Sequence, residues 1–206
     1  MRAWLVVFFL SGVFGLLGDQ FFHVRMGVLS YPSPDFLGQS WWVFPLMASS
    51  GVAAVLGALM LRRSIALRAV DAARPSIARL ALEVGFAFAA YGVTGLLPRE
   101  HLLLTALLVG TFALRFAFAP SPVALAAALA MAVAGPLVEA GVIALGGFAY
   151  GAGIPWEAVP LGFPYWLIAL YLHMGLTAAA IARAVDDATR AIAARVTTPA
   201  KENVTA

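Results

Sequence analysis

The chain is divided into six long apolar runs separated by shorter segments that are rich in Pro, Gly or charged residues. A helix needs about 20 apolar residues to cross a bilayer, and each run approaches that length, so each predicts a transmembrane helix. Asp19 and Gln20 stand where a signal-peptide cleavage site would end, which favours a retained first span. The predicted spans cover approximately residues 4–22, 40–61, 77–97, 101–119, 122–147 and 165–185. We therefore predict an all-α, polytopic membrane protein, with a six-helix transmembrane domain over residues 1–185 and a polar cytoplasmic tail over 186–206.

The composition supports this class and excludes several others. Hydrophobic residues make up 63% of the chain and charged residues 11%, against about 25% charged residues in soluble domains. The chain has no Cys and only three widely separated His residues, which argues against disulfides, thiolate chemistry and a zinc-protease motif. No nucleophile stands beside a base, and no phosphate loop or basic aromatic patch is present. We expect neither an enzyme nor a nucleic-acid-binding protein, and no cofactor or metal.

The charge distribution predicts the orientation of the spans. If both termini are cytoplasmic, only Arg25 and Arg99 of the 13 Lys and Arg residues lie on the outer side. This asymmetry follows the positive-inside rule, and adding or removing one span would destroy it. Most Trp and Tyr residues then fall near the outer interface, where amphipathic rings are favoured. We expect a multi-pass protein of the cell inner (plasma) membrane.

The fifth predicted span is unusual because it is rich in Ala and has polar or helix-breaking residues near its middle. Ala128, Ala132, Gly135 and Glu139 share one face at helical spacing, and such small side chains favour a position inside a bundle. A carboxyl group in hydrocarbon must be protonated, paired with a polar group or open to a water-filled cavity. Pro136 cannot donate to the Ala132 carbonyl. This face could hold a lipid hydroxyl, or it could belong to a kinked helix whose Glu bonds a neighbouring span.

Four further polar residues fall within the predicted spans. Glu83 and Arg115 lie at similar depth on consecutive antiparallel helices, which predicts a structural ion pair. His173 is expected to be a neutral, hydrogen-bonded core histidine. Asp19 lies near the outer end of the first span, where it could reach interfacial water or the outer loops. An alternative function is a small proton-coupled transporter that uses Asp19, Glu139 and His173.

Several motifs together resemble the insulin-induced gene (Insig) family of six-span, sterol-responsive membrane regulators. The sequence SWWVFP at the start of the second span is similar to the family's Trp-Trp-Val-x-Pro entry, and LGGFAY (residues 145–150) is similar to its Asn-Gly-Val-Tyr-Gln-Tyr segment. The sixth-span pattern is followed by Trp166, Gly175, Thr177, Ile181 and Arg183. Because Arg is used almost to the exclusion of Lys and Ala is abundant, the chain is identified as a prokaryotic, actinobacterial homologue.

This resemblance implies an Insig-like bundle with a lipid-accessible cavity lined by the first, fifth and neighbouring helices, and a role as a sensor or regulator. The expected ligand is a neutral lipid, a sterol or a diacylglycerol. The expected lipid-binding residues are Trp42, Ala128, Ala132, Gly135, Pro136, Glu139, Ala140 and Trp166. Ala140 replaces the family's sterol-binding Gln, and Ala119 replaces an Asp that partner regulation requires. The expected partners are therefore membrane lipid and further copies of the chain as a homo-oligomer, whereas a sterol-sensing escort protein is not supported.

The topology can be tested with single cysteines, because the chain has none of its own. Cysteines at Ser33 and Gly153 should react with a membrane-impermeant thiol reagent in intact cells, since both positions are predicted to lie outside. Cysteines at Arg68 and Ser121 should be protected until the cells are opened. Labelling at Arg68 in intact cells would overturn the six-span orientation.

Overall fold

The computed structural model of the chain describes residues 2–64, 76–151 and 162–197. Within these ranges, six helices are long and apolar enough to cross a membrane, which confirms the predicted number of spans. The elements are α1 (Arg2–Gly18), the π-helix η1 (Asp19–Val24) that continues it, β1 (Leu29–Ser30), α2 (Val43–Arg63), α3 (Ile77–Leu96), α4 (His101–Phe118), α5 (Pro122–Ala144), β2 (Ala149–Tyr150) and α6 (Trp166–Thr197). The positions Arg68, Arg74, Gly153, Trp156 and 198–206, on which parts of the predicted topology rest, lie outside the described residues.

Local sequence explains where several helices begin. The side chain of Ser76 accepts a hydrogen bond from the Arg79 amide, and that of Ser121 accepts one from the Ala124 amide, so each caps the helix that follows it. Pro122 occupies the first turn of α5, where its missing N–H costs nothing. At the other end of the chain, α6 continues to Thr197, past the predicted end at residue 185. Residues 186–197, the first part of the predicted polar tail, therefore continue this helix.

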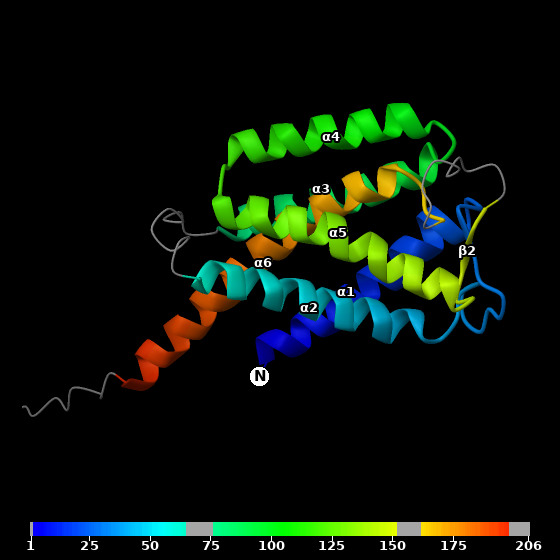
Figure 1. Ribbon diagram of the computed structural model, residues 1–206. Coiled ribbons are helices and arrows are strands. Elements are labelled where there is room, and N and C mark those ends of the chain that lie inside the picture. The colour runs from blue at the N-terminus through cyan, green and yellow to red at the C-terminus, as the bar shows by residue number, and fades with distance from the viewer. Residues whose placement is uncertain (1, 65–75, 152–161, 198–206) are drawn as a thin grey trace, which may run out of the picture.

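Buried Asp186 explains why α6 continues beyond the predicted span. Its carboxylate lies 3.4 Å from Arg62 Nε and 3.3 Å from Arg63 Nη2 at the end of α2, and 2.6 Å from Arg190 Nη2 one turn further along α6. These ion pairs join the C-terminal end of α2 to α6. This side of the bundle is called inner below, and the opposite side outer, after the predicted orientation. The last turns of α6 then leave the bundle (Figure 1).

Small residues set the closest helix contacts in the bundle. A Cβ built on Gly175 of α6 would collide with the backbone of Ala127 and Ala128 on α5, and one built on Gly51 of α2 would collide with Ser11 on α1. Such close approach maximises van der Waals contact between helices, which is the main attraction available inside lipid. The pairs α5–α6 and α1–α2 consequently form the most extensive interfaces, while α4 lies at the edge of the bundle (Figure 1).

The first span changes from α-helix to π-helix at Asp19. In this segment Asp19 and His23, which are four residues apart, lie within hydrogen-bonding distance of each other, 3.0 Å between Oδ1 and Nδ1. Gln39 supports this segment, because its Nε2 donates to the Leu16 carbonyl at 2.8 Å. Gly95 on α3 allows that helix to approach the backbone carbonyl of Phe22. π-helical turns of this kind occur frequently at functional sites.

Two short strands close the outer end of the molecule. β1, in the connector between the first two spans, pairs antiparallel with β2, in the connector between the last two, with Leu29 opposite Tyr150 and Ser30 opposite Ala149. This pairing brings the two outer connectors together over a buried cluster that includes Val28, Tyr31 and Trp166. The outer end is thus built from both halves of the chain.

The inner half of the membrane region contains the predicted ion pair. Arg115 Nη2 of α4 lies 2.5 Å from Glu83 Oε2 of α3 and donates to Thr177 Oγ1 of α6 at 3.1 Å, while Nη1 donates to His173 Nδ1 at 2.8 Å. His173 in turn donates from Nε2 to the Leu108 carbonyl at 2.9 Å, which requires the neutral tautomer with its proton on Nε2. Both predictions, a Glu83–Arg115 pair and a hydrogen-bonded core histidine, are confirmed.

The close contact between α5 and α6 can be tested by substitution. Replacing Gly175 with Leu should destabilise the protein by about 1–3 kcal/mol, because the new side chain would overlap the α5 backbone. Gly141 on α5 is a suitable control, since it is exposed and nothing lies within 4 Å of a Cβ built there. Thermal unfolding in detergent should show a lower Tm for Gly175→Leu and a small change for Gly141→Leu. Equal effects at the two positions would contradict this contact.

Candidate functional site

A buried carboxyl group, Asp19, lies at the centre of a cluster of hydrogen-bond donors near the outer end of the bundle. Its Oδ2 accepts from the Tyr31 hydroxyl at 2.5 Å, and its Oδ1 accepts from the Tyr91 hydroxyl at 2.6 Å and contacts His23 Nδ1. On the other side of the imidazole, Nε2 lies 2.7 Å from Thr94 Oγ1. Asp19 and Thr94 are fully buried. The cluster joins η1, the first outer connector and α3.

A second carboxyl group, that of Glu139 on α5, also accepts hydrogen bonds from two tyrosine hydroxyls. The Tyr150 hydroxyl donates to its Oε2 at 2.5 Å, and the Tyr171 hydroxyl of α6 donates to its Oε1 at 2.8 Å. The prediction that Glu139 would be paired with polar groups of neighbouring elements is therefore the alternative that this structure supports. Among the described residues, no Arg, Lys or His forms an ion pair with Glu139.

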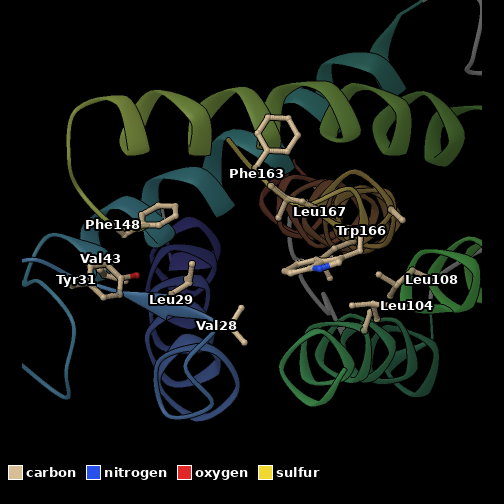
Figure 2. Packing of buried hydrophobic residues seen from close by; sticks show 13 residues of the cluster. Val28, Leu29, Tyr31, Val43, Leu104, Leu108, Phe148, Phe163, Trp166 and Leu167 are labelled. Carbon is tan, nitrogen blue, oxygen red and sulfur yellow. The ribbon is translucent and has the colours of Figure 1, made fainter. Parts of the chain in front are cut away.

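Trp166, at the start of α6, lies between the two carboxyl clusters. Its ring centroid is 6.3 Å from that of His23 on one side and 6.1 Å from that of Tyr150 on the other. The side chain is fully buried, yet its indole Nε1 has no hydrogen-bond acceptor among the described residues. Figure 2 shows the indole with Val28 on one side and with Leu104 and Leu108 on the other. A buried N–H donor without a partner is rare in proteins.

The tyrosines of the outer connectors remain protonated donors at physiological pH. Burial raises the pKa of Tyr31, and the nearby carboxyl groups of Asp19 and Glu139 raise it further. Burial likewise raises the pKa of Tyr150, with Glu139, Tyr171 and Asp19 adding to the shift. Both tyrosines therefore keep their protons and can donate to the carboxyl groups near neutral pH.

The structure places the predicted small residues of α5 inside the bundle. Ala128, Ala132, Gly135 and Pro136 are buried, and Ala140 is partly buried against the outer core. Two of these positions are filled by neighbouring residues, because Ala128 lies against Gly175 and Gly135 lies against the Tyr171 ring. The absent side chain at Gly135 makes room for the ring whose hydroxyl reaches Glu139. A lipid-binding role for these residues stays a prediction.

Three further residues that the sequence singled out lie outside α5: Trp42, Asp19 and His173. Trp42 is partly buried and packs with Tyr31, at 5.8 Å between ring centroids, so it borders the outer cluster. Asp19 reaches the outer connector through Tyr31, but it has no exposed surface. Of the two alternatives predicted for Asp19, contact with the outer loops is therefore the one that the structure supports, and contact with interfacial water is not. His173 belongs to the inner cluster with Arg115 and not to the outer one.

Most of the hydrogen-bond donors of this site are not predicted from the sequence. Tyr31, Tyr91, Tyr150 and Tyr171 come from four different elements, and His23 was placed in a connector rather than in a helix. The only available signal was the presence of two carboxyl groups in apolar spans, since each must find donors. Nothing in the linear order of the residues indicated which tyrosines would supply them.

The pairing of Glu139 can be tested by removing one of its donors. Tyr171→Phe should lower the stability of the protein by about 1–3 kcal/mol, because the partly buried carboxyl group of Glu139 loses one of its two hydrogen bonds. Tyr165→Phe is the matched control, since the Tyr165 hydroxyl bonds no described residue although its ring stacks on His101. Thermal unfolding of the two variants in the same detergent provides the measurement. A Tyr171→Phe variant as stable as Tyr165→Phe would contradict this role for the hydroxyl.

Comparisons with known proteins bear on the fold. No family model and no curated protein matches the chain. Among solved structures, the chain is similar to a mycobacterial Insig homologue, MvINS from Mycobacterium vanbaalenii, with a TM-score of 0.73 and 26% identity over 89% of this chain and 93% of that chain. A cross-linked MvINS trimer is similar with a TM-score of 0.75 and 23% identity over 90% of this chain and 95% of that chain.

These neighbours match the six-helix fold over nearly the whole chain, in agreement with the Trp-Trp entry and the sixth-span pattern of the sequence. The likeness extends from α1 to α6 rather than to a single helical hairpin. The resemblance stated from the sequence is thereby confirmed, and the chain is an Insig-like, multi-pass membrane protein.

Proposed function

We propose that this protein binds a neutral lipid that carries at least one free hydroxyl group, a sterol or a diacylglycerol, and acts as a sensor or regulator. The proposed head-group site lies at the outer end of the bundle, around Trp166, Glu139 and the tyrosines that surround them. The lipid's apolar part would extend along α5 and the neighbouring helices.

The observation that carries this proposal is the unpartnered indole N–H of Trp166. Leaving such a donor unsatisfied in an apolar site costs about 1–3 kcal/mol, so an oxygen-bearing ligand that accepts its hydrogen bond would gain that amount. The hydroxyl of a lipid could accept from Trp166 and donate to a tyrosine or carboxyl oxygen nearby. A sterol hydroxyl and the free hydroxyl of a diacylglycerol both have this capacity.

The charges around the site favour a neutral head group. Asp19 has the imidazole of His23 beside it, whereas Glu139 has only phenol donors, and neither carboxyl group is within ion-pair distance of a described Arg or Lys. A phosphate placed here would be repelled by two carboxyl groups and would find no cation to neutralise it. A phospholipid head is therefore a poor match, although its acyl chains would fit an apolar bundle equally well.

The geometry favours binding over catalysis. Asp19, His23 and Thr94 form a hydrogen-bonded series that resembles a nucleophile with its base, but the Thr94 hydroxyl also lies 2.6 Å from the Tyr91 carbonyl, to which it donates. A hydroxyl that is fully buried and already donating is badly placed to attack a substrate. The series is better explained as the support that holds Tyr91 and His23 beside Trp166.

The proposal also includes the membrane location, the orientation and the oligomeric state of the protein. The distribution of Arg residues supports cytoplasmic termini in the cell inner membrane, so the lipid site would face the outer leaflet. A homo-oligomer is supported by MvINS, which was crystallised as a cross-linked trimer. Light scattering of the purified protein would give the oligomeric state directly.

The lipid can be identified by extracting purified protein and measuring the extract by mass spectrometry. We expect a sterol or a diacylglycerol to be enriched over its proportion in the membrane. Trp166→Phe should weaken retention of this lipid about 2- to 10-fold, since it removes one hydrogen bond of about 0.5–1.5 kcal/mol while conserving an aromatic ring.

Trp41→Phe serves as the control, because Trp41 is 70% exposed and lies outside the proposed site. Its lipid content should equal that of the unmodified protein. Recovery of bulk phospholipid alone, in membrane proportions, would count against a specific site. Equal lipid retention by the Trp166→Phe and Trp41→Phe variants would show that the indole N–H does not bind the head group.

A further inference from the structure

Helix α4 is attached to the bundle unevenly along its length. Of its 18 residues, only Leu104, Leu108 and Arg115 are buried. The inner half is held by polar bonds, because Arg115 binds Glu83, Thr177 and His173, and the Leu108 carbonyl accepts from His173. Separating this half from α6 would expose an Arg and a His to hydrocarbon, which is costly.

The outer half of α4, residues 101–107, has no comparable bonds. Within the described residues, no hydrogen bond joins it to another helix. Its buried side chain is that of Leu104, which has no exposed surface, and His101 stacks on Tyr165 at 5.8 Å between ring centroids. If the Leu104 side chain moved outward, it would exchange contacts with the protein for contacts with lipid. Because lipid tails are as apolar as Leu, the hydrophobic effect does not oppose this movement inside a bilayer.

The remaining outer interfaces lack this freedom. α5 and α6 meet at the contact between Gly135 and Tyr171, and α3 meets η1 at the contact between Gly95 and Phe22. These helices interlock closely, and the hydrogen bonds of Asp19 and Glu139 cross between them.

Leu104 and Leu108 lie on the same side of Trp166, as Figure 2 shows, and all three belong to one buried cluster. We propose that the outer half of α4 is a lateral gate between the bilayer and Trp166, with Leu104 as its cover and the bonded inner half as its fixed end. The proposal rests on the lipid site proposed above, because the gate would admit that lipid. The movement would be a small outward tilt about the His173–Leu108 contact.

The first experiment measures the gate without any ligand. Because the chain has no Cys, a single cysteine at Leu104 can be reacted with N-ethylmaleimide in detergent, and its rate compared with that of a cysteine at Leu170, a position that is buried on α6. Gate opening should make the cysteine at 104 react at least about tenfold faster. Adding His101→Ala, which removes the stacking on Tyr165, should raise the rate at 104 further and leave the rate at 170 unchanged.

The second experiment measures lipid passage in vesicles with a diacylglycerol that carries a nitrobenzoxadiazole-labelled acyl chain. Leu104→Ala should accelerate both uptake and release of this probe by about tenfold, with unchanged occupancy at equilibrium. Leu103→Ala is the matched control on the same helix, since Leu103 is 52% exposed, and it should exchange the probe at the normal rate. His101→Ala should accelerate exchange as well, which provides a second variant if Leu104→Ala folds poorly.

The outcomes separate this inference from the proposed function. Cysteines at 104 and 170 that react equally slowly, with no response to His101→Ala, would overturn the gate whatever the ligand. Normal exchange rates in the Leu104→Ala and His101→Ala variants would also overturn it. A mobile position 104 in a protein that does not bind the diacylglycerol probe would contradict the proposed lipid and leave the movement of α4 established.

Discussion

The need to supply hydrogen bonds to two carboxyl groups in hydrocarbon organises the outer half of this protein. A carboxyl group without hydrogen-bond partners has a high free energy in hydrocarbon. Asp19 and Glu139 each accept hydrogen bonds from two tyrosine hydroxyls. The four tyrosines lie in the two outer connectors, in α3 and in α6. The outer ends of the helices and both connectors must therefore assemble together for either carboxyl group to be satisfied. This mutual dependence gives the site a defined shape, in the middle of which Trp166 is held.

The inner half is stabilised differently. Its core is built largely from Ala and Val residues of α1, α2, α5 and α6, so that helix backbones approach closely and van der Waals contact replaces the hydrophobic effect. Polar bonds are concentrated at Arg115, which joins α3, α4 and α6, and at Asp186, which joins α2 and α6. α6 takes part in both of these polar clusters and also supplies Trp166 and Tyr171 to the outer half. It is the helix through which the two halves are connected.

Similarity to MvINS at 26% identity shows how far such a fold tolerates change. Lipid-facing positions need only be apolar, and small residues can replace one another where helices meet. The polar residues are different, because each must have a partner of matching chemistry. The hydrogen bonds of Asp19 and Glu139 therefore restrict the sequence more strongly than the packing of the bundle around them does.

The sequence alone determined the class of the protein, because hydropathy and the positions of Arg respond directly to the bilayer. It also indicated the inner Glu83–Arg115 pair, since consecutive helices place residues of similar depth side by side, and the buried face of α5, since small residues follow its helical period. Only the tertiary structure decided how the carboxyl groups are satisfied. The π turn at Asp19, the pairing of β1 with β2 and the helical continuation after Val185 depend on partners more than 100 residues away in places. Hydrogen bonds between residues so distant in the chain leave no periodic pattern, so they become visible only when the chain is folded.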